Sequence, residues 1–161
     1  MFGACVMNPV SILRHQPSAR AVVRGGTVTG EVRFFQTERG ILVSAEMFGL
    51  PHSGETCQSG VFAFHIHIGQ CPAEHPDDPS AHLEGHYNPH DCPHPHHAGD
   101  LPPLFASQDG YAFQTVLTDR FALREILGKA VVVHAGRDDF TTQPSGDPGI
   151  MIACGEIRPM V

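Results

Sequence analysis

The sequence is poor in basic residues, with 10 Lys and Arg against 17 Asp and Glu, which gives a formal net charge of −7 at pH 7. A chain of this sign is not attracted to phosphate backbones or anionic lipids, so we expect neither a nucleic acid nor a membrane as partner. No apolar run reaches the length that crosses a bilayer. The first 20 residues lack a basic stretch followed by a continuous apolar core, so we expect no signal peptide and slightly favour the cytoplasm.

Long helical patterns are also scarce, whereas turn-forming residues are abundant, with 17 Gly and 14 Pro in 161 residues. Short segments of alternating apolar and polar residues lie between these turns, and this pattern is typical of β-strands. Residues 21–48 predict an antiparallel meander of three strands joined by glycine turns. A chain of this length forms one domain with its own core. We therefore expect an irregular N-terminal extension over residues 1–20 and an all-β domain over residues 21–161.

Two long segments without strand periodicity interrupt this pattern, residues 69–103 and 137–149. Loops of this length in compact domains are usually functional or disordered. Between these segments we expect a hairpin over residues 104–118, a short helix over residues 121–128 and a strand over residues 130–134. After the second segment we expect a final strand over residues 150–157.

Histidine is concentrated in one region, because nine of the 12 histidines lie in residues 61–100. Residues 61–68 predict a strand on which His65 and His67 share a face, about 7 Å apart, so both can reach one ion. The plainer alternative is two histidines on an exposed face. Clustered imidazoles compete for protons unless a metal binds their neutral nitrogens. The loop that follows is rich in ligand-type residues, and a metal could order it.

Five motifs follow one another in an order that resembles the copper/zinc superoxide dismutase family. They are Phe64-His65-Ile66-His67, Gly85-His86-Tyr87-Asn88-Pro89, His97-Ala98-Gly99-Asp100-Leu101, Val131-Val132-Val133-His134 with Asp138-Asp139 after it, and Ala153-Cys154-Gly155. The resemblance implies an eight-stranded antiparallel Greek-key β-barrel or sandwich with two long functional loops. It also implies superoxide as substrate, dismutated by a copper that cycles between two oxidation states, and it suggests a homodimer.

The resemblance also implies two metal sites. Copper would be bound by His65, His67, His86 and His134, and zinc by His86, His94, His97 and Asp100. His86 would bridge the ions and act catalytically by carrying a proton. The third zinc ligand could instead be His90 or, less plausibly, His96. Asp138 would orient His65 and His94 through their second ring nitrogens.

Five cysteines leave at least one without a partner in the chain. The resemblance implies a disulfide between Cys71 and Cys154. Cys57 and Cys92 have no counterpart in the usual family pattern, and we suggest that they form a second bridge, with two reduced thiols as the alternative.

One position departs from the family pattern in a way that bears on activity. Family members usually carry an arginine two residues before the final Ala-Cys-Gly, where it holds the superoxide anion, and here the residue is Met151. Arg137, the only basic residue of the second long loop, could replace it only if that loop folds back. We therefore expect a dismutase of reduced efficiency. The alternatives are a non-enzymatic copper- and zinc-binding protein that stores or delivers metal or has a structural role, and a domain stabilised by zinc alone.

Overall fold

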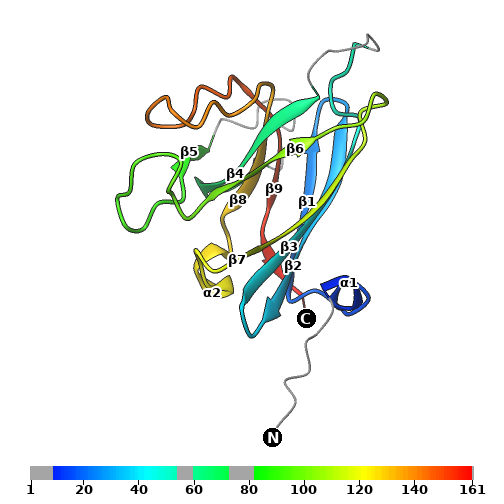
Figure 1. Ribbon diagram of the computed structural model, residues 1–161, viewed down its shortest axis with the longest axis vertical. Helices are drawn as coiled ribbons and strands as arrows, with labels where there is room; N and C mark the ends of the chain where they lie inside the picture. The colour runs from blue at the N-terminus through cyan, green and yellow to red at the C-terminus, as the bar shows by residue number, and fades with distance from the viewer. Residues whose placement is uncertain (1–8, 54–59, 73–81, 161) are drawn as a thin grey trace, which may run out of the picture.

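The computed structural model describes residues 9–53, 60–72 and 82–160, and within them β-strands dominate (Figure 1). The two helices have four residues each. All strand pairs are antiparallel. The elements are α1 (Pro9–Ile12), β1 (Ala19–Gly25), β2 (Val28–Thr37), β3 (Gly40–Phe48), β4 (Val61–Gly69), β5 (Leu83–His86), β6 (Asp100–Phe105), β7 (Ala112–Thr118), α2 (Leu123–Ile126), β8 (Ala130–His134), β9 (Met151–Glu156) and β10 (Arg158–Pro159). The predicted all-β class is confirmed.

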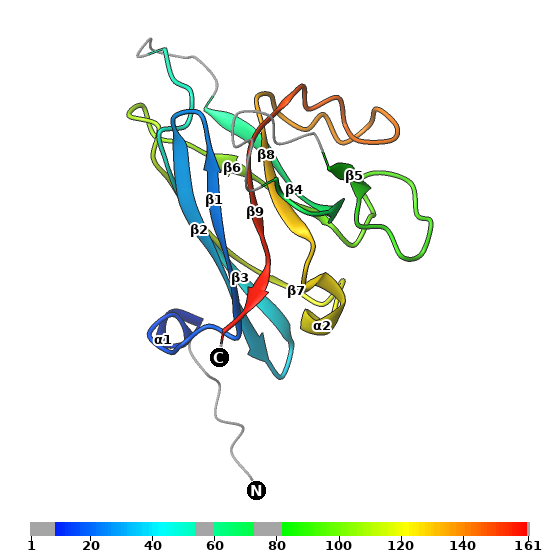
Figure 2. The ribbon, with the colours of Figure 1, turned by 180° about the vertical axis from the view of Figure 1, so that it is seen from behind.

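Eight of these strands follow one another in a single sheet, in the order β5-β4-β8-β9-β1-β2-β3-β7. β6 pairs with β4 and β10 pairs with β1, both off this path. The sheet is strongly curled into a half-barrel, and β6 and β7 cross in front of β1 and β9 in Figure 1 and behind them in Figure 2. The predicted eight-stranded antiparallel Greek-key fold is confirmed in this form.

The predicted meander is confirmed, since β1, β2 and β3 pair consecutively. Burial alternates strictly along β1, as a strand with one face on the core requires. In the described part of the segment before β1, Ile12, which ends α1, packs against Phe35 and Leu42 on the outer face of the meander. The division between an N-terminal extension and the domain at residue 20 stays a prediction.

Two local expectations are wrong. Residues 69–103 are not free of secondary structure, because β5 and the start of β6 lie within them. The strands on either side of the turn at residues 108–110 do not form a hairpin, because β6 pairs with β4 and β7 pairs with β3. The hairpin signal is local, whereas β6 and β7 each pair with a strand that is distant in sequence. The polar sequence of β5 carries no strand periodicity, and pairing with β4 alone makes it a strand.

The predicted disulfide between Cys71 and Cys154 is confirmed, with its Cα atoms 5.7 Å apart and 83 residues between them in sequence. It ties the chain just after β4 to β9. The suggested second bridge is not supported: Cys92 is a free cysteine whose thiol faces the backbone oxygen of His90 in the same loop. Cys57 lies outside the described residues. None of the helices in the described part of the chain is long and apolar enough to cross a membrane.

Candidate metal centre

The metal centre is organised around β4, whose two edges place the other ligand-bearing segments. In the register of the sheet, His67 lies opposite His86 of β5, and His65 lies opposite Asp100 of β6. On its other edge β4 pairs with β8, which ends at His134. Residues distant in sequence are thus brought together by backbone pairing alone.

The loop between β5 and β6 is fixed by three backbone hydrogen bonds, two to Ile66 of β4 and one between its own two ends. Ile66 N–H donates to Gly99 O at 2.8 Å, Gly99 N–H to Tyr87 O at 2.8 Å, and Tyr87 N–H to Ile66 O at 2.7 Å. A Cβ at Gly99 would collide with the Ile66 carbonyl oxygen, so glycine is required at this close approach. The two ends of the loop, with His86 and Asp100, are therefore fixed beside the histidines of β4.

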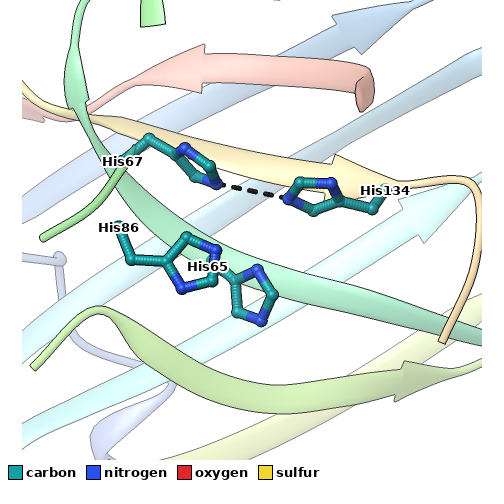
Figure 3. Close-up of side chains that lie close together, drawn as sticks. All are labelled: His65, His67, His86 and His134. Atoms are coloured by element: carbon teal, nitrogen blue, oxygen red, sulfur yellow. Dashed lines mark hydrogen bonds between the residues drawn. The ribbon is translucent and has the colours of Figure 1, made fainter. Parts of the chain in front are cut away.

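Four buried histidines form the first ligand group (Figure 3). One ring nitrogen of each lies within 4.8 Å of those of the others, and the group consists of His65, His67, His86 and His134. Nε2 of His67 lies 3.2 Å from Nε2 of His134, and the ring centroids of His65 and His86 are 4.0 Å apart. We call this set the copper group.

The second ring nitrogen of three of these histidines is held by the protein. Nδ1–H of His67 donates to Glu84 O at 2.7 Å, and Nδ1–H of His134 donates to Gly149 O at 3.3 Å. Nε2–H of His65 donates to an Asp138 oxygen at 2.8 Å. Each bond fixes the tautomer, so the nitrogen that faces the group carries a free lone pair, as metal binding needs.

Two nitrogens of the copper group test whether a metal fits. Nδ1 of His65 and Nε2 of His86 are buried and have no hydrogen-bond partner among the described residues. A buried polar atom without a partner costs about 1–3 kcal/mol. A metal ion between the four rings would satisfy both atoms, so the residues fit a copper ion with an all-nitrogen ligand set.

The second ligand group contains three imidazoles and one carboxylate, His86, His94, His97 and Asp100, again with ligand atoms within 4.8 Å. Nδ1 of His86 lies 2.7 Å from Asp100 Oδ1, and Nδ1 of His94 lies 3.1 Å from Asp100 Oδ2 without hydrogen-bond geometry. Nδ1 of His97 lies 3.3 Å from Asp100 Oδ1. Nitrogen and carboxylate donors in fourfold number suit zinc. We call this set the zinc group, and His86 belongs to both.

The structure distinguishes between the candidates for the third zinc ligand. His94 is 3% exposed and faces the group, whereas His90 and His96 are exposed on the loop. Two prolines, Pro93 and Pro95, flank His94 in sequence.

Asp138 connects the copper group and the zinc group through hydrogen bonds to one histidine of each. Its Oδ2 accepts the hydrogen bond from His65 Nε2, and its Oδ1 accepts one from His94 Nε2 at 2.9 Å. Oδ1 also accepts the Phe140 backbone N–H at 2.7 Å. Gly146, with φ +78°, packs over this contact, and a Cβ there would lie 2.7 Å from His94 Nε2.

Burial keeps three imidazoles of the copper group neutral. Desolvation lowers the pKa of His65 far below its ordinary range, the pKa of His67 to about 3 and the pKa of His134 to about 4. Burial by itself raises the pKa of Asp100, but its hydrogen bond with His86 and the nearby rings outweigh that and lower it. At neutral pH His65, His67 and His134 are therefore neutral and Asp100 is a carboxylate, the protonation states that bind divalent ions.

A cleft of about 420 Å³ opens onto the copper group. It is lined by His67, Glu84, Gly85, His86, Asn88, His97, His134, Pro144, Ser145, Pro148, Gly149 and Met151. Met151 therefore lies in the cleft, with the side chain of Glu84 exposed nearby, and no lysine or arginine is found in this lining. Arg137 is exposed and does not line the cleft.

Arg120 lies behind the zinc group, and the sequence did not single it out. Its Nη1 donates to the backbone oxygens of Pro95, His97 and Asp100 at 3.3, 3.4 and 3.3 Å. Gln143 was also missed, although its amide bonds to the backbone of His94. Neither residue belongs to a motif, and each contacts a loop distant in sequence, so no local pattern could have revealed them.

Comparisons with known proteins agree with this geometry. A family model described as copper/zinc superoxide dismutase (SODC) matches residues 28–157. The chain is 34% identical over 148 residues to a Cu-Zn superoxide dismutase 2 of Aquifex aeolicus (strain VF5), covering 83% of this chain and 81% of that protein. It is 34% identical over 136 residues to a Cu-Zn superoxide dismutase of Legionella pneumophila, covering 80% and 77%. It is 34% identical over 146 residues to a Cu-Zn superoxide dismutase of Escherichia coli (strain K12), covering 83% of this chain and 80% of that protein. With the two ligand groups, these matches confirm copper and zinc as the expected cofactors.

Proposed function

Because the chain belongs to the copper/zinc superoxide dismutase family, we propose that it converts superoxide to oxygen and hydrogen peroxide. The observation that carries this proposal is the pair of ligand groups that share His86, one of four imidazoles and one of three imidazoles and a carboxylate. A relative that had lost the chemistry would be expected to have lost a ligand, and here all seven ligand residues are present and buried.

The protein's own contribution is to hold the ligands and to handle a proton. Copper bound by the copper group would supply the one-electron redox chemistry, and zinc would be held by the zinc group, which shares His86. The Nδ1 side of His86 is occupied by Asp100, whereas Nε2 has no partner and faces the copper group. We assign to His86 Nε2 the proton that is carried to the reduced oxygen species. Asp138 orients His65 and His94, because each donates its second N–H to this carboxylate.

Capture of the substrate is where we expect this protein to be less efficient than its relatives. Superoxide is a small anion, so its capture depends on positive potential near the site. The lining of the cleft has Met151 at the position of the usual arginine and includes Glu84, while Arg120 directs its Nη1 at loop carbonyls. Metals held by the two ligand groups would then supply most of the attraction, because bound ions are the largest local charges.

No lysine or arginine among the described residues lines the cleft, and this supports a second candidate, a copper- and zinc-binding protein without dismutase activity that stores or delivers metal. Decay of superoxide in a stopped-flow instrument, with protein loaded with both metals, separates the two. The dismutase proposal requires a second-order rate well above that of the metal-free protein and of His134→Ala. A rate equal to those controls would leave only the metal-binding function.

We also propose a homodimer. Phe113 and Leu117 project from the outer face of β7 and are 47% and 45% exposed, which offers an apolar surface for a second copy. Sedimentation equilibrium of the wild type and of Leu117→Glu tests this. A monomeric wild type at micromolar concentration would contradict it.

A further inference from the structure

Gln143, in the loop between β8 and β9, makes a two-point contact with a zinc-group residue far away in sequence. The backbone N–H of His94 donates to Gln143 Oε1 at 2.9 Å, and Gln143 Nε2 donates to the backbone oxygen of His94 at 2.7 Å. The amide of Gln143 therefore satisfies both backbone polar groups of His94, as a neighbouring strand would do.

His94 needs such a partner because of its position. Pro93 and Pro95 flank it and have no N–H, and no strand includes this part of the loop. Buried backbone groups are rarely left without partners. The ring of His94 is buried, so its backbone must be fixed if Nδ1 is to stay directed at the zinc group.

The segment that carries Gln143 also forms one wall of the copper cleft. Pro144 and Ser145 follow Gln143 directly, and both line the cleft. Asp138, earlier in the same loop, bonds to the ring of His94 at 2.9 Å. The loop is thus attached to His94 twice, once at the ring and once at the backbone, and the wall of the cleft begins where the second attachment ends.

From this arrangement we infer that Gln143 is a positioning residue that couples the zinc group to the wall of the copper cleft. It acts through His94 and touches no reacting atom. The orientation of the zinc ligand and the position of Pro144 and Ser145 are set by the same side chain. This inference concerns metal binding and cleft geometry, and it holds whether or not the protein dismutates superoxide.

Zinc release tests the first half of the inference. We would load the wild type, Gln143→Ala, Gln143→Glu and the control Gln36→Ala with both metals and follow transfer of zinc to a colorimetric chelator. Loss of a residue that holds a metal ligand in place costs about 10–100-fold in metal affinity, and we expect a loss in that range for Gln143→Ala. Gln143→Glu keeps an acceptor for the His94 N–H but places a carboxylate oxygen against the His94 carbonyl oxygen, so we expect a loss in the same range.

Gln36 is a suitable control, because its exposed amide also donates to a backbone oxygen, that of Thr37, at the remote turn between β2 and β3. Far-UV circular dichroism of each variant establishes that the fold is retained, and Gln143→Glu carries the test if Gln143→Ala does not fold. Zinc affinities of folded Gln143 variants within twofold of that of Gln36→Ala would overturn the inference.

Azide binding to the copper tests the coupling. In the wild type we expect removal of zinc to change the azide affinity several-fold, because the wall of the cleft is attached to His94. In Gln143→Ala this difference should shrink to less than twofold, since that attachment is lost. An equal effect of zinc removal in both proteins would overturn the coupling, whatever the dismutase rate. A changed visible spectrum of Co²⁺ at the zinc group in Gln143→Ala would support it, and an unchanged spectrum would count against it.

Discussion

The copper group and the zinc group share His86 but are built differently. All four copper-group histidines lie on β4, β5 or β8, whereas His94 and His97 lie in the loop between β5 and β6. Strand residues are placed by backbone pairing on both sides of β4. The loop residues are instead placed by side chains from elsewhere, Arg120, Asp138 and Gln143. A ligand on a strand thus depends on the core, and a ligand in the loop depends on a few polar contacts.

The largest expected effect comes from removing the disulfide that fixes the strands around the copper group. Cys71→Ser removes the disulfide that joins the chain after β4 to β9. A crosslink over a loop of this length stabilises by about 4 kcal/mol in the chain-entropy model, an upper guide. Urea unfolding of the metal-free protein should show a loss of that order. Cys92→Ser, at the free cysteine, is the matched control and should change little; equal losses in both would refute the prediction.

We expect acid to destabilise the metal-free protein through the buried histidines of the copper group. The pKa values of His67 and His134 are lowered by burial to about 3 and about 4, whereas those of the unfolded chain are about 6.5. Below pH 6.5 the unfolded chain binds protons that the folded metal-free protein does not. Stability must then fall as pH falls to about 4, by up to about 1.4 kcal/mol per pH unit for each such histidine.

The measurement is the free energy of unfolding of the metal-free protein in urea between pH 7 and pH 4. Replacing His67 with Gln should reduce the slope, while His90→Gln at an exposed position should leave it unchanged. A wild-type stability independent of pH in this range would show that the copper-group histidines accept protons without unfolding.

Asp138→Asn sharpens the comparison between the groups, because Asp138 touches both. An amide cannot accept from both imidazoles at full strength. We expect zinc affinity to fall by about 10–100-fold and copper affinity by less, since His65 is also held by pairing on both sides of β4. Competitive titration with chelators measures both. Asp139→Asn, at the exposed neighbouring carboxylate, is the control, and a copper loss as large as the zinc loss would erase the proposed difference.

Met151→Arg has the smallest expected effect, about tenfold or 1.4 kcal/mol. A guanidinium in the cleft adds a fixed positive charge and a planar pair of donors for the anion. The second-order rate of superoxide decay should rise, and its decrease with added salt should steepen. Met151→Leu should leave the rate near that of the wild type. An unchanged rate in Met151→Arg would mean that another group already supplies the attraction, or that the protein is not a dismutase.

Much of the centre could be predicted because its motifs are local. His65 and His67 share a strand face by alternation alone. The motifs around His86 and His134 implied the remaining copper ligands, and the motif from His97 to Asp100 implied two zinc ligands. The pairing of β6 with β4 was missed, because residues 104–118 look like a hairpin and nothing nearby indicates a distant partner. The hydrogen bonds from Arg120 and Gln143 to the loop between β5 and β6 were missed for the same reason.

The sequence by itself determined the kinds of donor atoms, their order along the chain and the shared face of His65 and His67, because these follow from covalent spacing. The tertiary structure decided which histidine of the loop between β5 and β6 is the third zinc-group histidine. His90 and His94 both follow a proline in the same loop. Only His94 is bonded at its ring to the carboxylate of Asp138 and at its backbone to the amide of Gln143. It also decided that no lysine or arginine of the described residues lines the cleft, and that Nη1 of Arg120 bonds to backbone oxygens of the loop between β5 and β6. Such choices depend on contacts between segments about 20 to 50 residues apart, which exist only once the strands have paired.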